Sequence, residues 1–365
     1  MRKNPFKFGN AVSYPYFTNR SDEIEKVVSV LNSDNHLILF SPRRYGKSSL
    51  VFKVTGEQKR PVITLDLQIV TSVHDMAAQF LKRIYRVFPF ERVRQCVKNF
   101  RVVPVISVNP VTNAVDVTFN PSGDSTAMLE DVLNLPEKLS KKNNRLIVVF
   151  VEFQELQNIG PGLFQHFRPV LQHHKKVNYV FLGSQESLIR DIFEKKESPF
   201  YHFGLLMNLS KIPHDDFLYY LSTRFEKITD KHQDLSESIL DFTGCHPYYT
   251  QQLAYMIWEK VDKGLPLNGL IEDTVEELIN TRDIDYERMW IGLNRSDKKM
   301  LIALSLSDLQ PLSDRFLRQF DIGASSTAYS VLKRLSESGF IAKANNKYEI
   351  DDPFFKLWII QRRES

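Results

Sequence analysis

The chain has 365 residues, of which 42% are hydrophobic and 25% charged, and its formal net charge is +4. These values are ordinary for a soluble globular protein, and the length predicts two or three domains. A charge this small does not indicate a nucleic-acid partner. No apolar stretch approaches the roughly 18 residues of a membrane span, so no membrane partner is expected. The two cysteines, Cys96 and Cys245, and an N-terminus without an apolar signal segment predict a cytoplasmic protein with reduced thiols.

The first 200 residues alternate between helical and strand patterns. A helix is predicted over 21–31, since a Ser cap and acidic first turn precede apolar residues at helical spacing. Strands are predicted at 37–40, 61–66, 145–150 and 177–182, helices at about 48–54, 74–87 and 129–139, and an inserted β-hairpin within 102–119. This α/β alternation predicts a mostly parallel sheet with helices on both faces.

The segment from about residue 199 to residue 340 is predicted to be helical, because no strand pattern is evident there. Helices at 217–225, 235–242, 248–261 and 271–282 would form a helical lid. Short helices at 298–306, 314–320 and 326–336 precede a hairpin of 340–342 and 347–350 around Asn345-Asn346, which is a winged-helix pattern. The predicted domains are therefore 1–205, 206–290 and 291–365.

The segment LILFSPRRYGKSSL, residues 37–50, predicts a phosphate-binding P-loop. An apolar strand leads through a loop to Gly46-Lys47-Ser48 at the start of a helix, where backbone N–H groups and the helix dipole favour an anion. Lys47, expected at a solvent-facing loop end, would contact the β- and γ-phosphates, and the Ser48 hydroxyl would hold Mg²⁺. Ser41 replaces the first glycine of the pattern. The alternative is an ordinary strand-to-helix turn.

The segment LIVVFVEFQEL, residues 146–156, is similar to a Walker B strand, which ends in an Asp for the Mg²⁺ shell and a Glu that orients water. Glu152 is present, but Val151 occupies the Asp position. Because valine cannot accept a hydrogen bond from metal-bound water, Mg²⁺ affinity and hydrolysis are both expected to be impaired. The alternative is a core strand that ends at a surface Glu.

Several motifs together resemble the archaeal-type ATPases, a branch of the AAA+/STAND P-loop NTPases. Those proteins show GPRRxGKTSL and DEFQ segments, and this chain has Ser41-Pro-Arg-Arg-Tyr-Gly-Lys-Ser-Ser-Leu50 and Glu152-Phe-Gln-Glu-Leu156. Further similarities are Phe17-Thr-Asn-Arg20-Ser-Asp-Glu23-Ile24 to an FxxRxxEI segment, Gly244-Cys-His-Pro247 to a GxP motif, and Asp352-Pro-Phe-Phe-Lys-Leu-Trp358 to a DPFF-x-x-W segment. The likeness spans about residues 5 to 360.

The resemblance implies ATP or ADP and Mg²⁺ as cofactors. It places the nucleotide phosphates on the P-loop residues Pro42, Arg43, Arg44, Tyr45, Gly46, Lys47, Ser48 and Ser49, with Ser48 at the metal. It places Phe17 and Arg20 near the adenine and gives Glu152 the catalytic, water-activating role. Ser184, after a strand, would sense the γ-phosphate, and Pro247 would link the nucleotide to the lid. A plain turn at Ser184 and a plain helix start at Pro247 are the alternatives.

Other residues bear on activity and partners. His202 stands where relatives often carry an arginine, so any arginine sensor is weakened. Arg43 and Arg44 would steer polyphosphate, meet a neighbouring subunit or simply be solvated. His166, His173 and His174 lack a Cys or carboxylate at ligand spacing and are expected on a wet helix surface rather than at a metal. Phe354, Phe355 and Trp358 are expected in the core.

Three functions remain open from the sequence. The first is an ATP-binding conformational switch with slow hydrolysis, the second a nucleotide-binding pseudoenzyme that serves as an interaction scaffold, and the third a winged-helix DNA-binding regulator. Residues 296–365 hold 11 basic and 9 acidic side chains, which does not provide the basic face that DNA binding requires. The expected partners are a nucleotide and either a protein or a second copy of the chain; nucleic acid is not favoured.

Overall fold

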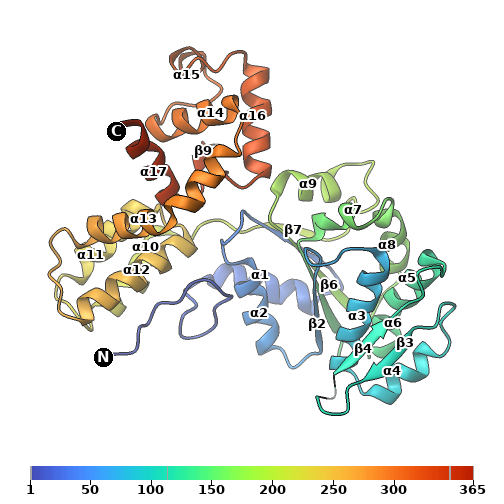
Figure 1. The fold of residues 1–365 in the computed structure, drawn as a ribbon. Coiled ribbons are helices and arrows are strands. Elements are labelled where there is room, and N and C mark those ends of the chain that lie inside the picture. The colour runs from blue at the N-terminus through green and yellow to red at the C-terminus, as the bar shows by residue number, and fades with distance from the viewer. Residues whose placement is uncertain (1, 113, 345–346, 365) are drawn as a thin grey trace. The chain divides into compact units, whose positions relative to one another are not determined.

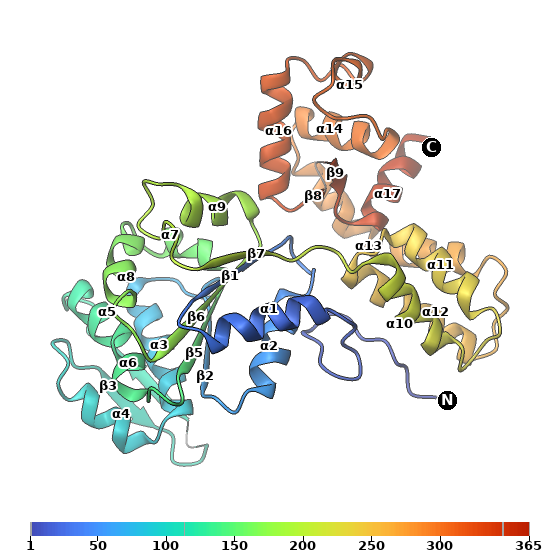
Figure 2. The ribbon, with the colours of Figure 1, turned by 180° about the vertical axis from the view of Figure 1, so that it is seen from behind.

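The computed structural model of the protein describes residues 2–112, 114–344 and 347–364 (Figures 1 and 2). The chain divides into two compact units. The sheet unit comprises residues 21–41 and 50–209, and the helical unit comprises the described parts of 1–20, 42–49 and 210–365. The predicted turn at Asn345-Asn346 lies outside the described residues. Among the described residues, no helix has the length and apolar character that crossing a membrane requires.

The sheet unit is built on five parallel strands in the order β2-β5-β6-β1-β7, which confirms the predicted parallel sheet. The strands are β1 (Leu37–Phe40), β2 (Val62–Asp66), β5 (Leu146–Val151), β6 (Val177–Gly183) and β7 (Leu205–Asn208). The prediction that no strand follows residue 199 was wrong, since β7 pairs with β1. Its sequence, LLMN, is short and has no β-branched residue, so it carries little strand signal.

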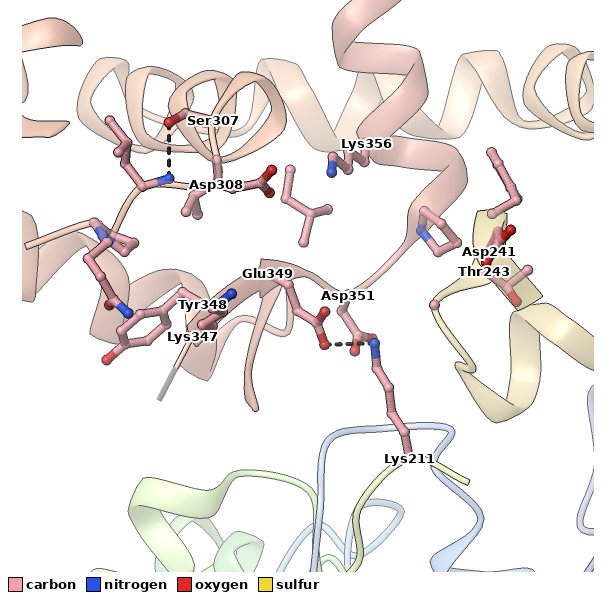
Figure 3. A pocket seen from close by; sticks show the side chains of 18 residues that line it. Lys211, Asp241, Thr243, Ser307, Asp308, Lys347, Tyr348, Glu349, Asp351 and Lys356 are labelled. Carbon is pink, nitrogen blue, oxygen red and sulfur yellow. Dashed lines mark hydrogen bonds and ion pairs between the residues drawn. The ribbon is translucent and has the colours of Figure 1, made fainter. Parts of the chain in front are cut away.

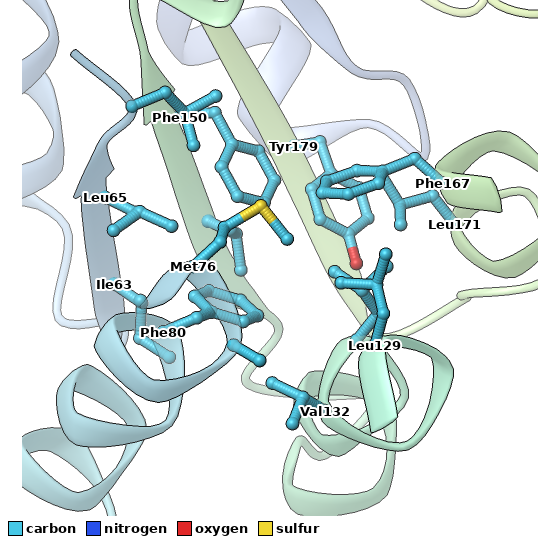
Figure 4. Close-up of a cluster of buried hydrophobic side chains, with 14 of the residues drawn as sticks. Ile63, Leu65, Met76, Phe80, Leu129, Val132, Phe150, Phe167, Leu171 and Tyr179 are labelled. Carbon is cyan, nitrogen blue, oxygen red and sulfur yellow. The ribbon is translucent and has the colours of Figure 1, made fainter. Parts of the chain in front are cut away.

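Helices cover both faces of this sheet (Figures 1 and 2). On one face lie α1 (Ser21–Asn32) and α2 (Lys47–Glu57), and on the other α3 (Val73–Val87), α5 (Ser125–Leu133) and α8 (Leu163–Leu171). The three central strands β5, β6 and β1 are buried almost throughout because alternate side chains point to opposite covered faces. On the α3 side Phe150 and Tyr179 pack against Met76 and Phe80 in the main core (Figure 4).

The remaining elements of the sheet unit are short. The predicted hairpin is present as β3 (Val105–Val108) and β4 (Val115–Thr118), paired antiparallel. The sequence did not predict α4 (Phe90–Val97), α7 (Leu156–Ile159), α8 or α9 (Glu186–Glu194); α4 and α9 each present a single apolar stripe to the core. The others are α6 (Leu135–Leu139) and the 3₁₀ turn η1 (Phe153–Glu155).

The helical unit contains the predicted helical lid and winged helix around one apolar core. The lid helices are α10 (His214–Phe225), α11 (His232–Thr243), α12 (Pro247–Asp262) and α13 (Leu270–Ile291). The winged helix comprises α14 (Arg295–Leu306), α15 (Asp314–Gln319), α16 (Ser325–Glu337), the hairpin β8 (Ile341–Ala344) with β9 (Lys347–Ile350), and α17 (Pro353–Glu364). Phe354, Phe355 and Trp358 are buried in this core, as predicted.

Candidate nucleotide-binding site

The loop that follows β1 has the backbone geometry of an anion-binding turn. β1 lies between β6 and β7, and α2 begins at Lys47. Within the loop Arg44 and Gly46 are left-handed, with φ of 66° and 98°. Left-handed residues in such turns direct successive N–H groups into a concavity suited to anions. A β carbon at Gly46 would meet no atom within 4 Å, so the loop is open on that side.

Lys47 is less exposed than the sequence predicted. Its side chain is buried at 7% exposure, and Nζ donates a hydrogen bond of 2.9 Å to the Pro42 carbonyl. The expectation of a solvent-facing loop end was therefore wrong, because the loop folds back over the lysine and supplies an acceptor for its ammonium. Ser48 is half-buried in the first turn of α2, and the buried Ser49 hydroxyl accepts a hydrogen bond from Val12 N at 2.9 Å.

The N-terminal segment reaches the same loop. Arg20 is buried, has a φ of 80° and donates a hydrogen bond of 3.3 Å to the Tyr45 carbonyl. Phe17 is half-buried three residues earlier. The structure thus brings Arg20 to the P-loop backbone, a contact that the motif similarity alone did not predict.

The carboxyl ends of β5 and β6 bring together two of the predicted site residues. Glu152, left-handed with a φ of 52°, directly follows β5, and Ser184 follows β6. One oxygen of Glu152, Oε2, accepts hydrogen bonds from the Ser184 hydroxyl at 2.6 Å, Ser184 N at 3.1 Å and Gln154 Nε2 at 2.6 Å. Gln154 is buried and was not predicted as a site residue. Three donors therefore fix the orientation of this carboxylate.

Val151, at the Walker B position, ends β5 and pairs in register with Asp66, the last residue of β2. Paired residues of parallel strands project from the same face of a sheet. Asp66, at the end of the neighbouring strand β2, is thus a carboxylate in register with Val151. Oδ1 of Asp66 accepts a hydrogen bond from Gln68 N at 3.0 Å.

The GxP segment presents aromatic rings to the P-loop. Pro247 is the first residue of α12, and His246 caps that helix by accepting a hydrogen bond from Tyr248 N at 3.2 Å. The Arg44 guanidinium lies 4.5 Å from the centre of the Tyr248 ring and donates a hydrogen bond of 3.2 Å to the Tyr249 hydroxyl. Arg43 and Arg44 are both exposed residues. The two tyrosines adjoin the GxP motif in sequence, and that adjacency was the only signal for them.

Tyr45, the next residue of the loop, lies among groups from the lid and the winged helix. It is 3% exposed, and its ring packs edge-on against His246 with centres 4.9 Å apart. His246 Nε2 lies 3.6 Å from Oδ1 of Asp351, the residue that follows β9. Burial raises the pKa of the Tyr45 hydroxyl, and the negative charges of Asp351 and Glu349 raise it further.

A polar pocket of about 260 Å³ adjoins this cluster in the helical unit (Figure 3). Its lining includes Asp351, Glu349 and Lys211, and the last two form an ion pair of 2.7 Å. The pocket therefore gives solvent a route to the Asp351 carboxylate, whose side chain is 12% exposed.

The histidines considered from the sequence belong to the sheet unit. His202 is exposed, with a φ of 52° and its ring stacked on Tyr201. His166 and His173 are exposed as expected, but His174 is buried and its Nδ1 lies 2.7 Å from the Tyr179 hydroxyl, which corrects the prediction of a wet surface. Among the described residues, His214, Glu237 and Asp241 place ligand-type atoms within 4.8 Å of one another.

In the winged helix, the basic residues of the presumed recognition helix α16 are paired with acids. Arg334 makes a bidentate contact with the buried Asp297, and Lys333 lies 3.9 Å from Glu337. These two side chains therefore do not form an unpaired basic face.

Comparison with known proteins places this geometry in a recognised fold. Residues 284–361 match the family described as "Probable winged helix domain". The structure is similar to a Walker-type ATPase of Pyrococcus abyssi (19% identity, 94% of this chain and 96% of that one, TM-score 0.67). It is also similar to the ORC2 protein of Aeropyrum pernix in its ADP form (14%, 99% and 100%, 0.53) and the ORC1 protein of that organism in complex with DNA (11%, 95% and 93%, 0.51). A comparison with curated proteins found no match.

The chain has the fold of these structures, with a parallel sheet, a helical segment and a C-terminal winged helix. The resemblance to archaeal-type AAA+ ATPases is thereby confirmed at the level of the fold. Sequence identities of 11 to 19% say nothing further about substrates or partners.

Proposed function

We propose that this protein binds ATP at the P-loop and acts as a nucleotide-dependent conformational switch with slow hydrolysis. The observation that carries the proposal is the loop after β1, with left-handed Arg44 and Gly46 and with Lys47 at the start of α2. Backbone N–H groups, a helix N-terminus and an ammonium are together the recognition chemistry of a polyphosphate. ATP is favoured over GTP because the sequence has no evident guanine-reading N-K-x-D motif.

Mg²⁺ fits this site only in part. Ser48, in the first turn of α2, offers a hydroxyl ligand, but the Walker B carboxylate is replaced by Val151. A bound Mg²⁺ would neutralise charge that develops on the phosphates. With one protein ligand fewer, we expect weak Mg²⁺ binding and therefore slow turnover.

Glu152 is the group that we propose to orient the attacking water. Its Oε2 already accepts three hydrogen bonds, from Ser184 and Gln154, so water would have to be bound by the remaining oxygen. Ser184 would thereby couple the γ-phosphate position to this carboxylate. Ser41 and His202 weaken the site further in this proposal, since one stiffens the loop and the other supplies less charge than arginine.

In the proposed switch, the parts 1–205, 206–290 and 291–365 act as ATPase domain, lid and winged helix. ATP would order the lid at the P-loop, and hydrolysis or exchange would release it for a protein partner or a second copy. A pseudoenzyme scaffold differs only in lacking turnover. One similar structure, of an ORC1 protein, is a DNA complex. The pairing of Arg334 and Lys333 with acids argues against that role for this winged helix.

The test is calorimetric titration of the full chain with ATP, with and without Mg²⁺. Because Lys47 is buried, Lys47→Met is the suitable variant: it keeps the aliphatic stem and removes the charge. We expect at least a tenfold loss of ATP affinity, since charge-assisted hydrogen bonds contribute about 1.5–3 kcal/mol. Lys53→Met, on the same helix and paired with Glu57, is the control and should bind normally. Equal affinity of Lys47→Met and the wild type would refute the P-loop assignment.

A further inference from the structure

The P-loop conformation is held by side chains from outside the sheet unit. We propose that Tyr248 and Tyr249 of the lid and Asp351 of the winged helix are positioning residues for the P-loop, acting through Arg44 and Tyr45. The inference rests on the proposed function only in its first experimental arm. The winged helix would then influence nucleotide affinity, because it belongs to the same compact unit as the P-loop.

The backbone of Arg44 is left-handed. A φ of 66° is unfavourable for a residue with a β carbon, and such conformations persist where the surroundings impose them. Arg44 is held at its far end by the Tyr248 ring, 4.5 Å away, and by the hydrogen bond of 3.2 Å to the Tyr249 hydroxyl. These contacts fix the side chain of a residue whose backbone helps to shape the loop.

Tyr45 is buried among polar groups of the helical unit. Its carbonyl accepts the Arg20 guanidinium, and its ring packs edge-on against His246. The Tyr45 hydroxyl, His246 Nε2 and Asp351 Oδ1 are all buried, and none of these three atoms has a hydrogen-bond partner among the described residues. His246 Nε2 and Asp351 Oδ1 lie 3.6 Å apart, slightly more than hydrogen-bond distance, which suits a bridging water. The winged-helix carboxylate thus reaches the P-loop through one histidine.

A turn just before α12 positions these side chains. Gly244 and Cys245 are both left-handed, with φ of 55° and 57°, and they turn the chain so that His246 caps α12. The same turn therefore places His246 against Tyr45 and begins the helix that carries Tyr248 and Tyr249. A movement of the winged helix at Asp351 would change the packing of His246 and hence of two consecutive P-loop residues. Reciprocally, a ligand at the P-loop would bias the winged helix.

The first experimental arm measures ATP affinity of full-length variants. Tyr248→Leu should weaken binding about fivefold and Tyr249→Phe, which removes only the hydroxyl, about threefold; Asp351→Asn should also weaken it about threefold. Tyr255→Leu, which like Tyr248 packs edge-on against Phe8, and Asp321→Asn, an exposed winged-helix acid paired with Lys299, are the matched controls and should bind like the wild type.

A substitution of Arg44 separates positioning from direct contact. Glycine accepts the left-handed conformation, whereas alanine does not. Arg44→Gly should therefore bind ATP at least fivefold more tightly than Arg44→Ala, and Tyr248→Leu should have no further effect in the Arg44→Gly background. Equal losses in Arg44→Gly and Arg44→Ala would mean that the guanidinium binds phosphate itself, and would overturn the positioning role.

The second arm needs no nucleotide. Amide hydrogen exchange of a peptide that covers 42–49 should speed up in Tyr248→Leu and Asp351→Asn but not in the two controls. Unchanged exchange in both variants overturns the inference, even if Lys47-dependent ATP binding is intact. Faster exchange in a protein that binds no ATP would instead leave this inference standing and remove the proposed function.

Discussion

At the scale of single residues, the pairing of Val151 with Asp66 decides how an engineered Walker B site would behave. An aspartate at 151 would supply the missing Mg²⁺ ligand but would lie directly opposite a second carboxylate. Like charges at paired strand positions destabilise a sheet by roughly 0.2–1 kcal/mol. The substitution therefore has a catalytic benefit and a structural cost that can be measured separately.

We expect Val151→Asp to raise Mg²⁺-dependent ATP turnover at least tenfold, which corresponds to about 1.4 kcal/mol of barrier. Val151→Asp with Asp66→Asn should keep the gain and recover the lost stability, measured by urea denaturation. Adding Glu152→Gln should abolish the gain. If Val151→Asp folds and binds ATP but turns over no faster, either the metal is held elsewhere or the chain is a pseudoenzyme.

The residue-level predictions of exposure failed where packing decides the outcome, whereas a missing ligand can be read from the residue type. The substitution at Val151 was evident from the strand pattern, because no valine can ligate a metal. The burial of Lys47 and His174 was not, since a lysine or histidine in a polar stretch is usually solvated. Their acceptors, the Pro42 carbonyl and the Tyr179 hydroxyl, are set by how the chain folds back.

At the scale of secondary-structure elements, two buried histidines, His36 and His174, both contact Tyr179 of β6. His36 Nδ1 accepts a hydrogen bond from Tyr179 N at 3.2 Å, and His174 lies against the Tyr179 hydroxyl. The pKa of both histidines is lowered to about 4, chiefly by burial; the positive charge of Arg168 contributes to the shift of His36, and Glu137 partly opposes the shift of His174. Both imidazoles are therefore neutral in the folded sheet unit at neutral pH.

The sheet unit should accordingly lose stability in acid. An unfolded histidine takes up its proton near pH 6.5, whereas these two take it up near pH 4 when folded, so stability falls as pH drops through that window and levels off below it. Each contributes up to about 1.4 kcal/mol per pH unit. Urea denaturation at pH 7 and pH 5 should show a smaller difference in His174→Gln, and the full difference in the control His173→Gln, which changes an exposed ring. An equal pH dependence in both variants would contradict this account.

Element boundaries were predictable where a cap or a breaker marks them, and missed where tertiary contacts define them. The helix starting at Ser21 was recognised from its acidic first turn, and α12 begins where Pro247 favours a first turn. By contrast α13 runs to Ile291, beyond the predicted 282, since no breaker occurs before Gly292. β7 was missed because its strand character comes from pairing with β1.

At the scale of the whole molecule, the compact units do not follow the predicted domain boundaries. The loop 42–49 packs within the unit that contains residues 210–365, although it lies between β1 and the rest of α2 in sequence. This packing could not be predicted from the sequence, because contacts such as Arg44 with Tyr248 join residues some 200 positions apart.

A fragment that contains only residues 1–209 should therefore fold its sheet but bind ATP poorly. It keeps all five strands and Lys47, yet lacks Tyr248, Tyr249 and Asp351. We expect circular dichroism of a folded α/β protein and an ATP affinity at least tenfold below that of the full chain, measured by calorimetry. Full affinity in a folded fragment would show that the sheet alone organises the loop.

The division of the chain also bears on how the protein matures during translation. The P-loop is synthesised within the first 50 residues. The two tyrosines and the carboxylate that pack around it, at positions 248, 249 and 351, are synthesised much later. At roughly 5–20 residues per second, that interval amounts to about 15–60 s. A nascent chain would therefore carry its glycine-lysine turn for most of its synthesis without the partners that shape it. If the loop binds nucleotide as proposed, that binding would depend on completion of the polypeptide.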